Sequence, residues 1–300
     1  MVLNKVSLTG ASSMLGLHLI NKLIKNNYKI LALSRTRPKI KHKNLIYKKF
    51  DIKKKYTQEK FESFFNNSSI IIHAGCTSNY KKEKNKKNAF LANLNVTRKI
   101  GLLANSNEKK LIFISGAIIY KNQKNKNNEN SIQKRNTKDY YVKSKIISEK
   151  LLLKLKKRGL NLLILRPSSI YGFGQKKNKI ITKLVSRAKK KKILELYDLD
   201  SSINLIHAAD VANFITKSIK SKKAKGIFNL GNKLVNYRYI ANELKRIFKC
   251  KIISKKTKLI NRKNTQTLDV SSKKSNLILN WRAKINLNRG LLSIKNHEIL

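Results

Sequence analysis

The sequence predicts an α/β protein built on a doubly wound parallel sheet, with a smaller C-terminal lobe. Short apolar runs alternate with longer segments of helical period, which is typical of βαβ units. The first run leads directly into a glycine-containing turn, and the rhythm changes after Pro167. We therefore expect the sheet domain in residues 1–171, joined by about 203–231, and the smaller lobe in 172–202 and 232–300.

Six apolar runs are the expected strands of this sheet. They are Lys5–Leu8, Lys29–Leu33, Asn44–Lys48, Ser69–His73, Lys110–Ser115 and Asn161–Arg166. The segments of period 3.6 between them predict helices at Leu15–Asn26, Asn88–Asn105 and Tyr140–Arg158. Two Lys- and Asn-rich stretches without an apolar period, at 79–87 and 121–136, predict loops.

The chain is strongly basic, with 69 Lys and Arg residues against 15 Asp and Glu and a formal charge of +54. Such a charge is typical of proteins that bind nucleic acid or an anionic membrane. Lys, Asn and Ile, whose codons are A/T-rich, make up 128 of the 300 residues, and Arg is scarce. Drift of the genome toward A+T explains this bias without a partner. We therefore expect no specific nucleic-acid partner.

The sequence predicts a cytoplasmic protein without a metal site. Cys76 and Cys250 lack metal-ligand spacing and are expected to be two buried free thiols in a reducing compartment. His73 and His207 have no second ligand nearby and are expected to pack or cap strand ends. The N-terminus has too few apolar residues for a signal peptide, and no apolar run approaches the length of a membrane span.

The turn Thr9–Gly16 follows the first strand and opens the first helix, where a dinucleotide-binding fold needs small residues. Gly10 allows the tight turn, Gly16 allows close packing of helix on strand, and the helix N-terminus offers N–H groups to a pyrophosphate. Ser13 stands where a third Gly is usual, and its Cβ narrows the approach to the phosphates. The expected phosphate-binding residues are Gly10, Ser12, Ser13, Met14 and Gly16.

Two further positions predict contacts with the adenosine half of a dinucleotide. An acidic residue that would bind a ribose 2′-hydroxyl is absent after the second strand, where Arg35 stands instead. Arg35 favours the 2′-phosphate of NADP over NAD, although a solvated surface Arg is the alternative. Asp51, followed by Ile52, is placed to accept a hydrogen bond from an adenine amine, or is an exposed loop carboxylate.

Tyr141 and Lys145 lie four residues apart and therefore share one face of a helix. A fixed ammonium beside a phenol favours the phenolate, so the pair is suited to proton transfer at an alcohol or carbonyl oxygen. The same spacing also occurs at Tyr56/Lys60, Tyr80/Lys84 and Tyr120/Lys124. Spacing alone does not select among the four pairs.

Taken in order, the motifs resemble the extended short-chain dehydrogenases/reductases of the NAD-dependent epimerase/dehydratase group. The matching segments are Thr9–Gly16, Asp51, His73–Gly75, Asn95–Thr97, Ile114–Tyr120, Tyr141–Lys145 with Glu149, Arg166–Gly172, Ile206–Ala212 and Phe228–Gly231. Among the four Tyr/Lys pairs, only Tyr141/Lys145 has Ser144 and Glu149 in the positions of that group. The resemblance therefore selects this pair.

The resemblance implies a Rossmann-type fold, an NAD or NADP cofactor and an acid–base site. Tyr141 would be the general acid/base, and Lys145 would bind the nicotinamide ribose and favour ionisation of the phenol. A Ser or Thr after the fifth strand normally orients the substrate hydroxyl, but Gly116 stands there, with Ser115 adjacent. Either Ser115 takes that role or the hydrogen bond is missing. The other implied cofactor contacts are His73, Ala74, Gly75, Asn95 and Pro167.

The implied activity is that of an NAD(P)-dependent nucleotide-sugar epimerase or keto-sugar reductase. The Asp-Glu pair that serves dehydration in the group is replaced here by Ala117 and Ile118. The resemblance also implies a homodimer formed through the helices near 88–105 and 140–158. Two alternatives stay open: a reductase of a non-sugar carbonyl, such as a sterol or flavonoid-like ketone, and a non-catalytic dinucleotide-binding or RNA-associated protein.

Overall fold

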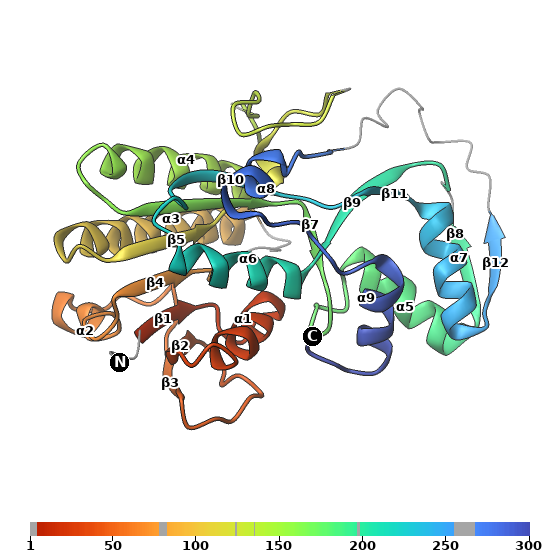
Figure 1. The fold of residues 1–300 in the computed structure, drawn as a ribbon, viewed down its shortest axis with the longest axis horizontal. Coiled ribbons are helices and arrows are strands. Elements are labelled where there is room, and N and C mark those ends of the chain that lie inside the picture. Colours follow the sequence, from red (N-terminus) through yellow and green to blue (C-terminus); the bar gives the residue numbers. More distant parts are fainter. Residues whose placement is uncertain (1–4, 78–82, 124, 135, 197–198, 255–267) are drawn as a thin grey trace.

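A seven-stranded parallel sheet forms the centre of the molecule (Figure 1). The computed structural model describes residues 5–77, 83–123, 125–134, 136–196, 199–254 and 268–300. The strands, in the order β10-β6-β5-β4-β1-β2-β3 across the sheet, are β10 (Gly226–Leu230), β6 (Leu162–Pro167), β5 (Lys110–Ile114), β4 (Ile70–His73), β1 (Lys5–Thr9), β2 (Lys29–Ser34) and β3 (Leu45–Lys49). The predicted fold class is confirmed, and each of the six expected strands is found within one residue of its predicted ends.

Helices cover both faces of the sheet. On one face lie α1 (Met14–Ile24) and α6 (Ala208–Lys220), and on the other α2 (Gln58–Glu62), α3 (Glu83–Ser106) and α4 (Tyr140–Lys156). The three predicted helices are confirmed. The loop predicted at 79–87 is wrong from Glu83 onward, because Glu83 and Lys86 form an ion pair one turn apart that suits the start of α3. Residues 78–82 lie outside the described part of the chain.

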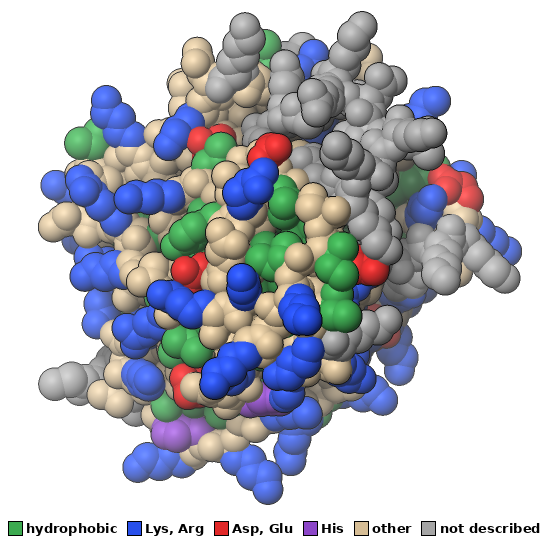
Figure 2. Space-filling view, turned by 90° about the vertical axis from the view of Figure 1, so that its right-hand side faces the viewer, with side chains coloured by type: hydrophobic (Ala, Val, Ile, Leu, Met, Phe, Trp, Pro, Cys, Tyr) green, Lys and Arg blue, Asp and Glu red, His purple; other side chains and the backbone are tan. Residues whose placement is uncertain are grey.

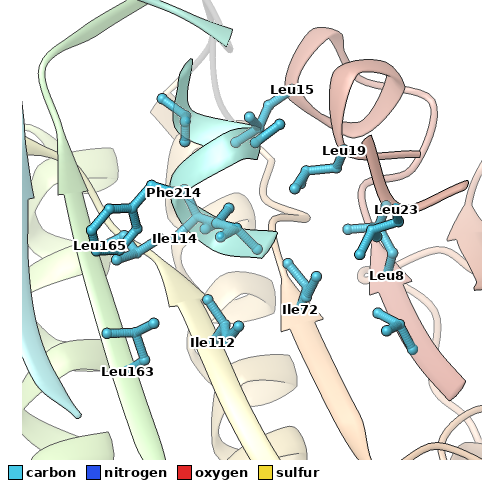
Figure 3. Close-up of a cluster of buried hydrophobic side chains, with 14 of the residues drawn as sticks. Leu8, Leu15, Leu19, Leu23, Ile72, Ile112, Ile114, Leu163, Leu165 and Phe214 are labelled. Atoms are coloured by element: carbon cyan, nitrogen blue, oxygen red, sulfur yellow. The ribbon is translucent and has the colours of Figure 1, made fainter. Parts of the chain in front are cut away.

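Alternation of side chains along the strands divides the core into two layers. Ile112 and Ile114 of β5 face α1 and α6, whereas Leu111 and Phe113 face α3 and α4. Figure 3 shows the first layer, where Phe214 of α6 lies close to apolar side chains of the strands. Strands that are buried on both faces must be apolar at nearly every position, which explains why these runs were readable in the sequence.

Most of the remaining C-terminal elements pack around a hydrophobic cluster of their own. A small sheet contains β7 (Ser169–Tyr171), β9 (Ser202–His207) and β11 (Leu234–Asn236), and a second pairs β8 (Ile193–Leu196) with β12 (Lys251–Ser254). The helices here are α5 (Ile180–Lys191), α7 (Tyr237–Phe248) and α9 (Leu287–Lys295). In contrast, α8 (Lys273–Leu279) packs on β10, and Trp281 meets Phe214. The proposed division into domain and lobe stays a prediction.

The Lys- and Asn-rich stretch 121–136 contains no helix among its described residues, as expected, but two of its residues anchor it to distant parts of the chain. Asn127 is fully buried, and its backbone and side-chain N–H groups donate to the carbonyl of Asp269. The carboxylate of Glu129 accepts from the backbone N–H of Asn229 at 2.8 Å. A polar sequence without a period conceals these long-range pairings.

A buried ion pair joins α4 to the sheet. Arg166 of β6 and Glu149 of α4 are each 1 % exposed and lie 2.5 Å apart. The same guanidinium donates to the hydroxyl of Tyr120 at 2.6 Å, and Tyr120 donates in turn to Asn229 at 2.8 Å. All the polar groups of this network find partners, as burial requires. The network therefore fixes where α4 lies against β6 and β10.

Lys and Arg side chains are spread over the face that Figure 2 presents, among hydrophobic and other side chains. The described residues include five salt bridges, and four of them have at least one substantially exposed partner. Exposed pairs contribute little to stability. Within the described part of the chain, no helix is both long and apolar enough to cross a membrane.

We predict that Glu149→Gln destabilises the protein by about 3 kcal/mol, because the isosteric amide leaves a buried guanidinium without its counter-charge. Urea unfolding followed by circular dichroism would measure the change. Glu83→Gln is the matched control, since it removes the exposed ion pair with Lys86, and it should change stability by less than about 0.5 kcal/mol. Equal losses in the two variants would contradict this account.

Candidate active site

The predicted site residues follow the carboxyl ends of neighbouring strands. Because these strands are all parallel, their carboxyl ends share one edge of the sheet. The chain runs outward from β1 to β3 on one side and from β4 to β10 on the other, so this edge has a switch point between β1 and β4. The residues at the strand ends are Gly10, Arg35, Asp51, Ala74, Gly75, Ser115 and Pro167.

At the switch point the backbones of two strands come close together. Gly10 has a φ of +73°, and a Cβ there would lie 2.8 Å from the Cα of Gly75. A Cβ on Gly16 would overlap the carbonyl oxygen of Gly10. Ser13 caps α1, and its hydroxyl accepts from the N–H of Gly16 at 3.1 Å. Only glycines permit this turn. We call the turn Gly10–Gly16, which ends at the N-terminus of α1, the cradle, because such a helix start suits an anion.

His73, at the end of β4, is buried in a chain of hydrogen bonds. Its Nδ1 lies 2.7 Å from the hydroxyl of Thr9, and its Nε2 lies 3.1 Å from that of Thr97. Since Thr97 donates to the carbonyl of Asn93 and Thr9 accepts from Gly75 N–H, we assign the proton to Nε2. Burial, with the nearby charge of Lys145, lowers the pKa of His73 to about 3. His73 is therefore a neutral packing residue, as expected.

Asn93, which the sequence did not single out, fixes the chain after β4. Its side chain accepts from the N–H of Thr77 and donates to the Thr77 carbonyl, both at 2.9 Å. The predicted contact residue Asn95 is exposed, away from this buried side of α3. Asn93 and Thr97 are four residues apart and therefore share the buried face of α3. This spacing was the signal in the sequence that could have identified Asn93.

The residues predicted to contact the adenosine half of a dinucleotide follow the ends of β2 and β3. Arg35 is exposed in the loop after β2. Asp51, Ile52 and Asn95 line one cavity of about 750 Å³ between the end of β3 and α3. One oxygen of the Asp51 carboxylate accepts from the N–H of Lys53 at 3.0 Å. The structure thus brings Asp51, Ile52 and Asn95 together, and places Arg35 on a separate loop.

Tyr141 and Lys145 lie in the N-terminal half of α4, whose start is capped by Asp139. Lys145 is 5 % exposed, and its Nζ donates to the carbonyl of Ile114 at 2.7 Å and lies 5.8 Å from the Tyr141 ring centroid. Burial lowers the pKa of Lys145, while Cys76 and Glu149 oppose that shift. Burial, followed by the neighbouring Cys76, raises the pKa of Tyr141 well above its usual value. The expected lowering of this pKa by Lys145 is therefore not seen, because burial is the largest cause and acts in the opposite direction.

The other three Tyr/Lys pairs have different surroundings. Tyr120 is buried in the Arg166 network, and the hydroxyl of Tyr56 accepts from the backbone N–H of Asp51 at 2.8 Å. Tyr80 and Lys124 lie outside the described residues. Of the two pairs whose residues are both described, only Tyr141/Lys145 has both residues on one helix.

Tyr141 lines two adjoining cavities, of about 520 and 380 Å³, and shares both with Ile118 and Lys179. The smaller cavity is also lined by Ser115 and Ser168, whose hydroxyls find no hydrogen-bond partner among the described residues. Unpaired buried hydroxyls suit a polar ligand.

Gly116 is the residue that precedes the 3-10 helix η1 (Ala117–Ile119). This position has room for a side chain, because a Cβ there would meet only Ile118 Cγ2, at 3.7 Å.

The two cysteines differ in exposure. Cys250 is buried, as predicted, but the prediction that Cys76 is buried was wrong. Cys76 lies three residues past the end of β4, where the chain has left the packed sheet and reached its open edge. His207 caps α6 through Nδ1, which accepts from Ala209 N–H at 3.2 Å, as expected of a capping residue. The described residues include no group of three potential metal-binding side chains.

The low pKa of His73 predicts a specific pH dependence. Below about pH 6.5 the unfolded chain binds a proton at this residue, but the native protein does not until about pH 3. Acidification across this window therefore favours unfolding by about 1.4 kcal/mol per pH unit. The advantage in unfolding free energy of the wild type over His73→Gln should shrink at that rate between pH 6 and pH 4.5, measured by urea denaturation. A gap independent of pH would refute the assignment.

Comparison with known proteins agrees with this geometry. The model of the NAD dependent epimerase/dehydratase family matches residues 6–231. No curated protein matches the chain in sequence.

Three solved structures illustrate the likeness in fold. The UDP-glucuronic acid 4-epimerase of Bacillus cereus, in complex with UDP-glucuronic acid and NAD, is 18% identical with a TM-score of 0.83, and 98% of each chain is covered. The dTDP-glucose 4,6-dehydratase of Bacillus anthracis str. Ames, in complex with NAD, is 17% identical with a TM-score of 0.80, covering 98% of this chain and 96% of that one. An epimerase of Methanothermobacter thermautotrophicus is 16% identical with a TM-score of 0.85, covering 98% and 91%. At these identities the structural likeness shows the fold, and the family model, which spans most of the chain, shows that the protein belongs to the NAD-dependent epimerase/dehydratase family.

Proposed function

We propose that this protein is an NAD(P)-dependent nucleotide-sugar epimerase or keto-sugar reductase. The observation that carries the proposal is the position of Tyr141 and Lys145. They lie beside the carboxyl end of β5, one strand away from the close approach of Gly10 to Gly75. A cofactor held in that cradle and a substrate in the cavities at Tyr141 would meet at this pair.

The residues at the sheet edge fit a dinucleotide. The glycines at positions 10 and 16 let the turn pack closely on the neighbouring backbone, and α1 presents its N-terminus there, where it would bind a pyrophosphate. We propose that Asp51 accepts from an adenine amine and that Lys145 binds the nicotinamide ribose. Exposed Arg35 suits a 2′-phosphate, so we propose NADP as the preferred cofactor. When bound, the cofactor supplies or accepts a hydride.

The role that we propose for Tyr141 is proton transfer at the reacting oxygen. Because burial keeps the phenol protonated near neutral pH, it is suited to donate a proton to a carbonyl oxygen as hydride arrives at the carbon. Lys145 is a buried cation near the ring and would stabilise the phenolate that remains.

The cavities support a polar, anionic substrate. Ser115 and Ser168 line the smaller cavity and have hydroxyls without a partner among the described residues, and Lys179 lines both cavities. These groups suit a sugar and its diphosphate better than an apolar sterol or flavonoid-like ketone. Ala117 and Ile118 provide no carboxyl group at the start of η1, which disfavours dehydration.

We predict that Tyr141→Phe lowers kcat by at least about 100-fold with little change in KM, because proton transfer is lost while binding groups remain. The assay would follow NAD(P)H absorbance with a panel of UDP- and dTDP-sugars and their 4-keto derivatives. Tyr239→Phe, which changes an exposed tyrosine of α7 that lines neither cavity, is the control and should keep its activity. Turnover at the wild-type rate by Tyr141→Phe on a confirmed substrate would sink the proposal.

We predict that Gly116→Ser raises kcat about tenfold, because it supplies the hydroxyl that this position lacks and the new Cβ meets only Ile118. Ser115→Ala separates the two possibilities for the wild type. If Ser115 already orients the substrate, Ser115→Ala loses activity and Gly116→Ser gains none. The prediction for Gly116→Ser would then be wrong, whereas the proposed acid–base role of Tyr141 would be unaffected.

A further inference from the structure

One face of α1 is covered by parts of the chain that lie far away in the sequence. Its residues, spaced as one side of a helix requires, are Met14, Leu17, His18 and Asn21. Gly174, in the turn after β7, packs so closely that a Cβ there would lie 3.1 Å from Leu17 Cδ1. The side-chain amide of Asn21 donates to the carbonyl of Ile299 at 3.3 Å, and Figure 1 shows the C-terminal end of the chain between α1 and α9. The C-terminal elements therefore lie against the helix that begins at the cradle.

His18, in the middle of this face, is buried without a hydrogen bond. It is 0 % exposed, and neither of its ring nitrogens has a partner among the described residues. The ring meets that of His207, at the start of α6, edge to face, with the two centroids 5.2 Å apart. A Cβ on Gly172 would lie 3.3 Å from Nε2 of His18 and 3.1 Å from Nε2 of His207. Position 172 therefore has no room for a side chain that could bond to the two rings.

His207 is bonded as a neutral imidazole. Its Nδ1 accepts from the N–H of Ala209 at 3.2 Å, and its Nε2 lies 3.3 Å from the hydroxyl of Ser293. Because that hydroxyl donates to the carbonyl of Gly290 at 2.8 Å, we assign the proton of His207 to Nε2. These bonds join the start of α6 to α9. A second proton, on Nδ1, would remove the acceptor that caps α6.

The charged and titratable side chains on the elements around the two rings provide no counter-charge. They are Lys22 of α1, Tyr171 of β7, Asp210 of α6, Arg289 of α9, and His297 and Glu298 after α9. The two oxygens of the Asp210 carboxylate accept from the backbone N–H groups of Lys284 and Ile285, at 3.0 Å each. The exposed carboxylate of Glu298 accepts from the side chain of Asn296 at 3.1 Å. No salt bridge within the described ranges includes a histidine. A second proton on either ring would therefore be a buried charge without a partner.

Burial lowers the pKa of both histidines. The pKa of His207 falls to about 3, with smaller contributions from His18 and Arg289. Burial also lowers the pKa of His18, although the backbone at Leu300 and Phe173 opposes the shift. When the contact opens, water reaches the rings and restores an ordinary pKa of about 6.5. Below about pH 6.5 the open form therefore binds protons that the closed form does not, so acid favours opening.

We infer that the contact between His18 and His207 is an acid-sensitive latch, which holds α9 and residues 296–300 on α1 at neutral pH and releases them below about pH 6. The inference rests on this packing and not on the proposed activity. Since α1 begins at the cradle, release also removes support from the turn Gly10–Gly16. The two histidines thus link acidity to the edge of the sheet where we propose that the cofactor binds.

Hydrogen exchange followed by mass spectrometry tests the latch in the full-length protein, without cofactor. Amide protection, referred to the intrinsic exchange rate at each pH, would be compared at pH 7.5 and pH 5.0. Peptides from α1 and from residues 287–300 should lose at least about thirtyfold in protection, which is the factor expected when one imidazole pKa rises from about 3 to about 6.5 on opening. At pH 5.0 they should also exchange faster than peptides from β5, because the opening is local. Protection that does not change with pH, or that equals the protection of β5 at both pH values, would overturn the inference.

A variant that cannot be protonated at either position separates the latch from other effects of acid. His18→Leu removes a ring that makes no hydrogen bond to the described residues, and His207→Asn keeps a side chain that can cap α6. In the double variant, protection of α1 and of residues 287–300 should change by less than about threefold between the two pH values. His42→Gln, in the exposed loop before β3, is the matched control and should keep the wild-type response.

The variants add a second way to refute the latch. If the acid-induced loss of protection persists in the double variant, other groups cause it and the inference fails. If the double variant does not fold, the comparison of α1 with β5 in the wild type decides alone. Because neither measurement requires a cofactor or a substrate, failure of the latch and failure of the proposed function are distinguishable.

Discussion

The close contact between the backbones at Gly10 and Gly75 is the constraint on which the site depends. It exists because β1 and β4 are neighbours and parallel, so both chains leave the sheet at the same edge. A side chain at either glycine would separate the two turns, and the φ of +73° at Gly10 disfavours any other residue. From this contact the chain continues on one side into α1 and on the other to Cys76 and Thr77. The contact between Gly10 and Gly75 therefore positions both the start of α1 and Thr77, which lines a cavity together with Tyr141.

Two of the few acidic residues of the chain hold α4 in place. Asp139 caps the helix start, and Glu149 neutralises the buried Arg166. Together they fix both ends of the segment that carries Tyr141 and Lys145. Elsewhere on the surface, Lys and Arg side chains have few acidic partners. The site is thus positioned by one exposed capping carboxylate and one buried ion pair, whereas the net charge of +54 acts only as a general field.

The sequence was sufficient for six of the seven strands of the main sheet, for three of its helices and for the glycine turn, because each has a local signal: apolar runs of strand length, a period of 3.6, or a glycine at a strand end. It did not show that Asn127 would be buried or that Glu129 would bind Asn229, since their partners lie about 100 or more residues away. It also misjudged Cys76, because exposure at a sheet edge depends on how far the chain has left the strand. The spacing of Asn93 to Thr97 indicates that Asn93 faces inward, but the predicted contact residue was Asn95.

The central claim is that this edge of the sheet binds a dinucleotide. Titrating the wild-type protein into NADPH and NADH, while following nicotinamide fluorescence, tests it most directly, beside a salt-dependent RNA-binding assay. The account predicts saturable enhancement with both cofactors, tighter binding of NADPH through Arg35, and RNA binding that is weak at physiological salt. Salt-sensitive RNA binding without any fluorescence signal from either cofactor would contradict it and favour a non-catalytic, RNA-associated protein on the same fold.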